Sequence, residues 1–166
     1  MKKRILLLIL TSIFFATGCG TKEEKAEEVM EKESMEEEKE AEIEETTDRL
    51  ENYIASIQEQ SNIIQNDLEN SSLTQTDLNI KSQELYELWD GALNELWSEL
   101  KSILPKEEFE KILEEQREWI EKKEEAIEKV GKEVEGGSMF SLVVNGEASK
   151  ITEKRVYEIY EILKNH

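Results

Sequence analysis

The sequence predicts a small all-α protein, in which an antiparallel helix hairpin and a C-terminal helix form a bundle preceded by an acidic tether. Three observations support this prediction. Apolar residues recur at intervals of three and four over several long segments, as they do on amphipathic helices. The only proline, Pro105, and the glycines near residue 136 fall between these segments, where turns are expected. The one strand-like run, residues 139–146, has no second strand with which to pair.

The N-terminal residues 1–18 are predicted to form a lipoprotein signal peptide. A basic start is followed by an apolar run from Ile5 to Phe15, shorter than the roughly 20 residues that a membrane-spanning helix needs. The only cysteine, Cys19, directly follows Ala16-Thr17-Gly18. This arrangement is similar to a lipobox, whose cysteine is diacylated, although Ala16 stands where leucine is usual. An ordinary signal peptide is the alternative, but we expect an anchor at Cys19 that holds the protein on the extracytoplasmic face of the cell membrane.

The tether, residues 19–47, is rich in Glu and Lys. Between Thr21 and Leu50 there are 14 acidic and 5 basic residues, so this segment repels itself and favours an extended, flexible linker. As a coil, its roughly 25 residues would span about 28 Å. Because Glu and Lys are also good helix formers, the sequence leaves open whether the tether is helical or disordered.

Residues 48–72 are predicted to form an amphipathic helix and a loop. Thr47 can cap the helix, and its apolar positions recur at helical spacing. They are Leu50, Tyr53, Ile54, Ile57, Ile64 and Leu68. This helix is either a coiled-coil stem or an additional helix packed on the domain that follows. The stretch ENSSLTQTD then interrupts the pattern, which indicates a loop.

A second helix is predicted from about Thr76 to Ile103, ending before Pro105. Trp89 and Trp97 lie about 80° apart on its apolar stripe, which favours a place in the core over a ligand platform. Asp90 and Asn94 lie at the edge of this stripe. A third helix is predicted from Lys106 to about Val130, and the two helices form an antiparallel hairpin.

The third helix is followed by a loop marked by Gly131, Gly136 and Gly137. We expect residues 139–146 to continue this loop, with Phe140, Leu142 and Val143 plugging the end of the bundle. Thr152 is then predicted to cap the last helix, which carries Val156, Ile159, Tyr160 and Leu163 on one side.

Composition excludes several classes of function. With 40 acidic and 21 basic residues the formal charge is −19, which disfavours nucleic acid and attracts basic partners. One cysteine and one terminal histidine, His166, exclude an internal disulfide and disfavour a zinc site. No activated nucleophile, glycine-rich phosphate loop or calcium loop is present. We therefore expect no enzyme activity, no metal and no cofactor.

The arginines suggest a structural network. Beyond residue 19 the chain has only Arg49, Arg117 and Arg155, and arginine is suited to a fixed pair of hydrogen bonds with a carboxylate. The hypothesis is a clamp in which Asp90, Asn94 and Gln116 meet Arg117 or Arg155 at the rim of the core.

Four stretches within residues 73–163 carry a resemblance to a known family: WDGALNELW, EEQREWIEKKEEA, EGGS and TEKR, together with Asn79 and Tyr86. In this order they resemble the LprI-type lysozyme inhibitor domain, so residues 73–166 are expected to form an LprI-like helical domain. The positions that match the pattern are Asp90, Leu93, Asn94, Trp97, Gln116, Arg117, Trp119, Ile120, Gly137, Ser138, Thr152 and Arg155. Lys123 departs from it, since arginine is usual there, and the cysteines of many members are missing.

The resemblance implies inhibition of lysozyme, and the acidic charge fits a basic partner of this kind. The motif residues are expected to determine the fold rather than to contact the enzyme. The alternative is an envelope lipoprotein with a structural or sensing role that binds a surface protein or a cell-wall component. The sequence leaves the oligomeric state open.

Overall fold

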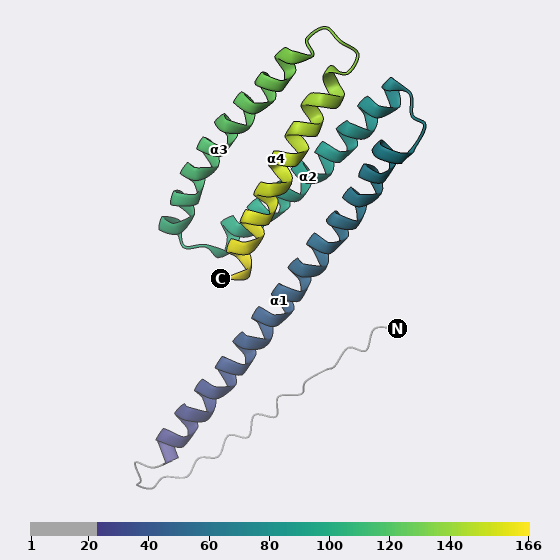
Figure 1. The fold of residues 1–166 in the computed structure, drawn as a ribbon. Coiled ribbons are helices and arrows are strands. Elements are labelled where there is room, and N and C mark those ends of the chain that lie inside the picture. Colours follow the sequence, from purple (N-terminus) through teal and green to yellow (C-terminus); the bar gives the residue numbers. More distant parts are fainter. Residues whose placement is uncertain (1–22) are drawn as a thin grey trace. The chain divides into compact units, whose positions relative to one another are not determined.

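A computed structural model describes the backbone of residues 23–166 and the side chains from residue 45 onward. Four helices follow one another: α1 (Glu23–Asn70), α2 (Gln75–Ile103), α3 (Lys106–Glu133) and α4 (Phe140–Lys164) (Figure 1). The prediction of an all-α bundle is confirmed. The predicted signal peptide and the lipidation site Cys19 lie outside the described residues. No helix within residues 23–166 has the length and hydropathy needed to cross a membrane.

Helix α1 differs from the flexible linker expected for the tether, residues 19–47, of which the structure describes residues 23–47. It begins at Glu23 and continues to Asn70, so the helical alternative is the one that the structure shows. Glu, Lys and Ala dominate its first half, and all three have high helix propensity. The described residues 23–43 are separate from the compact unit Glu44–His166, which contains the bundle.

The later part of α1 is an integral helix of this bundle. Leu50, Ile54 and Ile57 are buried in the hydrophobic core. The indole Nε1 of Trp89 on α2 donates to Ser61 Oγ at 3.2 Å, and the Tyr157 hydroxyl on α4 donates to Gln58 Oε1 at 2.6 Å. Of the two alternatives left open by the sequence, the structure therefore shows a helix packed on the domain.

Helix α2 begins and ends where local sequence signals place its termini. Thr74 is the N-cap and forms a capping box with Asp77, whose side chain accepts from the Thr74 backbone amide at 3.1 Å. The helix ends at Ile103, and Leu104 is its C-cap. Pro105 disfavours a helical conformation at Leu104, the residue before it, and so ends the helix there. The predicted start at Thr76 is one residue late.

The prediction for the start of the last helix is wrong. Residues 140–146 form the first two turns of α4, which begins at Phe140. Phe140 is 43% exposed and does not plug the bundle, while Thr152 is fully buried in the middle of the helix and caps nothing. The turn before α4 is instead made by Gly136, whose φ of 72° favours glycine.

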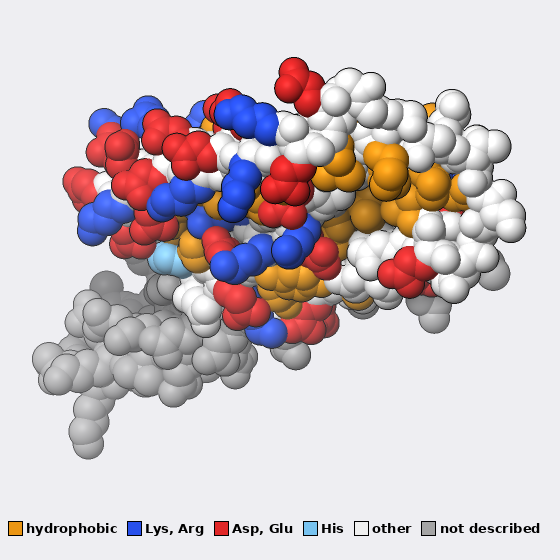
Figure 2. Space-filling view, turned by 45° about the horizontal axis from the view of Figure 1, so that its top comes forward, with side chains coloured by type: hydrophobic (Ala, Val, Ile, Leu, Met, Phe, Trp, Pro, Cys, Tyr) orange, Lys and Arg blue, Asp and Glu red, His pale blue; other side chains and the backbone are white. Residues whose placement is uncertain are grey.

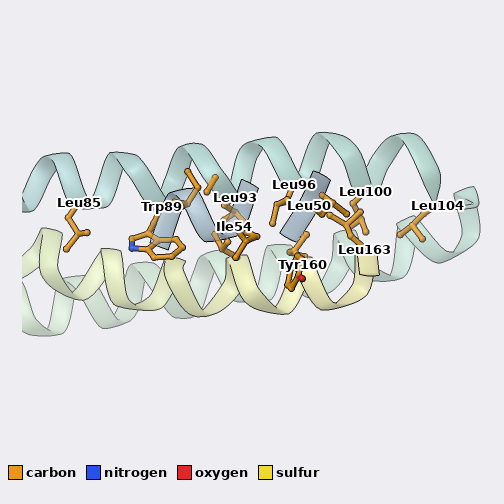
Figure 3. Packing of buried hydrophobic residues seen from close by; sticks show 14 residues of the cluster. Leu50, Ile54, Leu85, Trp89, Leu93, Leu96, Leu100, Leu104, Tyr160 and Leu163 are labelled. Carbon is orange, nitrogen blue, oxygen red and sulfur yellow. The ribbon is translucent and has the colours of Figure 1, made fainter. Parts of the chain in front are cut away.

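The hydrophobic core lies among α1, α2 and α4. Trp89, Leu96 and Leu100 of α2 pack against Val156 and Ile159 of α4, and all five are almost completely buried. Figure 3 shows the leucines of α2 in a row facing α4. The prediction that Trp89 faces the core is confirmed, and the half-buried Trp97 packs on the Phe109 ring at 5.3 Å.

Helix α3 is the peripheral helix of the bundle. It packs against α4, and only Gln116 and Gly131 among its 28 residues are buried. The helix therefore exposes most of its surface to solvent.

Candidate functional site

The outer face of α3 carries a row of glutamates. Seven of them follow one another at intervals of three and four, so they lie along one side of the helix. This glutamate stripe consists of Glu107, Glu110, Glu114, Glu118, Glu121, Glu125 and Glu128. All seven side chains are exposed. At 1.5 Å per residue, the stripe is about 32 Å long.

Basic residues of α3 neutralise part of the stripe. Arg117 contacts Glu114 at 2.9 Å, and Lys132 contacts Glu128 at 2.6 Å and lowers the pKa of that carboxyl. Glu110 and Glu118 have longer ion pairs, at 3.7 Å with Lys106 and at 3.4 Å with Lys122.

The remaining stripe residues, Glu107, Glu121 and Glu125, form no ion pair with any residue whose side chain the structure describes. Figure 2 shows acidic and basic side chains intermingled over the α3 side of the molecule. The stripe is therefore an anionic surface with three free carboxylates, which favours contact with a basic protein.

Behind the stripe, Asp90 is at the centre of a polar cluster between α2 and α3. Asp90 accepts hydrogen bonds from the Tyr86 hydroxyl at 3.3 Å and from Asn94 Nδ2 at 3.2 Å. Its basic neighbour is Lys123, whose Nζ lies 4.0 Å from Asp90 Oδ1. Burial, followed by the charge of Asp90, raises the pKa of Tyr86. The predicted meeting of Asp90 with an arginine is thus wrong, because Lys123 occupies that position.

A second network contains the buried arginine. Arg155 is only 6% exposed, and its Nε donates to Gln116 Oε1 on α3 at 2.8 Å. Its Nη1 donates to Glu158 Oε2 at 2.9 Å. Arg117, by contrast, lies on the surface beside Glu114. The single clamp predicted from the sequence is therefore two separate networks, and only the Gln116–Arg155 bond joins α3 to α4.

The other motif positions lie mostly at contacts between helices or in the loop before α4. Leu93 and Thr152 are buried, and Trp119 is partly buried. Ile120 is 40% exposed. Gly137 and Ser138 belong to the loop, where the Ser138 carbonyl accepts from Asn79 Nδ2 at 3.0 Å. These positions thus hold helices and loop together.

The glutamate stripe was missed in the sequence, although its signal is present there. The acidic residues of α3 recur with the period of a helix and lie opposite its apolar positions. Because acidic residues are abundant throughout the chain, this periodicity is less noticeable than that of the apolar residues. Within residues 45–166, no group of His, Cys, Asp and Glu side chains is arranged to hold a metal ion.

Comparison with models of protein families identifies a family for most of the bundle. The family model described as "Lysozyme inhibitor LprI" matches residues 67–159, which is more than half of the chain. No curated protein and no solved structure matches the chain. The matched segment begins near the end of α1 and includes α2, α3 and most of α4, and with them the glutamate stripe and both polar networks.

Proposed function

Because the chain belongs to the LprI lysozyme inhibitor family, we propose that it binds and inhibits lysozyme or a similar basic hydrolase of the cell envelope. The observation that carries this proposal is the match of the family model to the helices of the bundle. The protein acts by binding and catalyses no reaction itself.

The glutamate stripe is the surface that we assign to this contact. It lies on the helix with the fewest buried residues, so a partner reaches it without any rearrangement of the core. Lysozymes of the c type are strongly basic, and complementary charge raises the rate at which the two proteins meet. The free carboxylates of Glu107, Glu121 and Glu125 also contribute to this attraction without first breaking an ion pair.

The location that we propose for this activity is the extracytoplasmic face of the cell membrane. Support comes from the N-terminal sequence, in which a basic start and a short apolar run precede Cys19. Two acyl chains on this cysteine would give stable attachment. An inhibitor held there would meet a hydrolase in the space between the membrane and the cell wall.

The experiment is an assay of cell-wall lysis by lysozyme in the presence of the full chain. We expect inhibition that weakens as ionic strength rises, because exposed charges are screened. The variant Glu107→Gln/Glu121→Gln/Glu125→Gln removes the free carboxylates of the stripe and is expected to inhibit less.

The matched control is Glu59→Gln/Glu69→Gln/Glu161→Gln, which makes the same change in net charge at exposed positions on α1 and α4. It is expected to inhibit as the wild type does. Equal losses in both variants would show that total charge alone is responsible. No inhibition by the wild type at low ionic strength would refute the proposed function and favour a structural or sensing role in the envelope.

A further inference from the structure

A groove between α3 and α4 carries an unusual concentration of positive charge. Residues 45–166 include 28 acidic and only 14 basic residues, yet four lysines line this one groove. They are Lys122 and Lys123 on α3, and Lys150 and Lys154 on α4. We call it the lysine groove; its volume is about 430 Å³.

Lys123 is held in a fixed place in the wall of this groove. Its side chain is only 13% exposed. The Nζ lies 4.9 Å from the centre of the Trp119 ring and 5.6 Å from that of Tyr86, within the range of cation–π attraction. Its separation of 4.0 Å from Asp90 is at the limit of an ion pair. Lys123 therefore supplies a positioned charge that its neighbours neutralise only in part.

The other lysines are also weakly paired. Among the described side chains, Lys150 forms no ion pair. Lys154 lies 3.8 Å from Glu158, which is already bonded to Arg155 at 2.9 Å. Lys122 pairs with Glu118 at 3.4 Å, and both are well exposed.

In a domain with so many carboxylates, this arrangement leaves cations facing one another across a groove. Like charges that line one groove repel one another, and a bound anion relieves that repulsion. At physiological ionic strength the Debye length is about 8 Å, so these lysines act on a nearby ligand more strongly than the distant acidic surface does.

We propose that the lysine groove binds a phosphate ester whose body is a sugar ring or a similar small, partly apolar group. Lysine binds phosphate as a point charge, and several lysines in one groove suit a doubly charged group better than a single carboxylate. Trp119 and Ile151 supply the apolar part of the lining. The volume falls in the range of small-molecule sites, about 300–1,000 Å³. Glu147 and Glu158 also line the groove, so four lysines face two carboxylates there. The charge of Glu147 disfavours a second anionic group at its position.

This inference does not depend on the proposed inhibition of lysozyme. The experiment is an NMR titration of the full chain, in which the indole signals of the three tryptophans are followed while inorganic phosphate, glucose 1-phosphate or glucuronate is added. We expect glucose 1-phosphate to shift the Trp119 signal and to bind more tightly than the other two probes. Inorganic phosphate lacks the body that contacts Trp119 and Ile151, and glucuronate carries less charge.

The variant Lys150→Ala/Lys154→Ala is expected to weaken the binding of glucose 1-phosphate at least about tenfold, because each lysine contributes a charge-assisted contact. The matched control Lys106→Ala/Lys111→Ala removes the same charge from exposed positions at the other end of α3 and is expected to bind as the wild type does. Absence of a Trp119 shift, equal losses in the two variants, or equal binding of glucuronate would each overturn the proposal.

Discussion

Replacing Gln116 with methionine tests whether the Gln116–Arg155 bond holds α3 on the bundle. Gln116 is 9% exposed and Arg155 is 6% exposed, so water cannot readily replace the lost amide oxygen. Arg155 Nη2 already lacks a hydrogen-bond partner among the described residues, and Gln116→Met would leave Nε unpaired as well. A hydrogen bond to a charged group contributes about 1.5–3 kcal/mol, so we expect the free energy of unfolding to fall by about 2 kcal/mol.

For a unit of the size of Glu44–His166, this loss corresponds to a fall in Tm of roughly 8 °C. The assay is thermal unfolding of the full chain followed by circular dichroism at a helix band. The control Glu115→Met makes a similar change at the neighbouring exposed position and should alter stability by less than about 0.5 kcal/mol. Gln116→Glu keeps an acceptor and should restore stability. A Tm for Gln116→Met within about 2 °C of the wild type would refute the reasoning.

Three further predictions concern stability. Ser61→Ala removes the acceptor for the buried Trp89 indole and should cost about 1 kcal/mol in urea unfolding, after allowance for the better helix propensity of alanine. Burial raises the pKa of Glu153 in the folded state. Its contribution to stability is therefore fully present below the pKa of the unfolded state and is lost as the pH rises through the pKa of the folded state. We expect Glu153→Gln to raise Tm at pH 7 but not in acid. Gly136→Ala should destabilise the folded protein by about 1–2 kcal/mol, because residue 136 has a positive φ. Gly146→Ala should stabilise it by up to about 1 kcal/mol, because Gly146 is exposed within α4 and alanine has the higher helix propensity. Calorimetry of both variants measures the two changes.

The predictable parts of the fold are those with strong local signals. The termini of α2 and the start of α3 follow from Thr74, Asp77 and Pro105, whose capping and φ preferences act over a few residues. The start of α4 was mispredicted because residues 140–146 combine β-branched residues with Asn and Gly, which locally disfavour helix. Packing against α2 and α3 outweighs that preference, since tertiary contacts routinely override intrinsic propensity.

The polar networks show a different limit. Helical spacing correctly placed Asp90 beside Asn94, because both lie on one helix. It could not decide which cation from another helix would reach Asp90, since this depends on the relative rotation of α2, α3 and α4. Lys123 reaches it between Tyr86 and Trp119, while Arg155 is directed to Gln116.

The association rate constant of lysozyme with the immobilised full chain tests the central claim most directly. Wild type, the glutamate-stripe variant Glu107→Gln/Glu121→Gln/Glu125→Gln and the control Glu59→Gln/Glu69→Gln/Glu161→Gln are compared at low and physiological ionic strength. We predict that only the stripe variant associates several-fold more slowly than the wild type. We also predict that raising the ionic strength slows the wild type more than this variant. The reason is that removing charges at the rim of an interface changes mainly kon and its dependence on salt. Equal rate constants for the stripe variant and the control, or no binding by the wild type, would contradict the account.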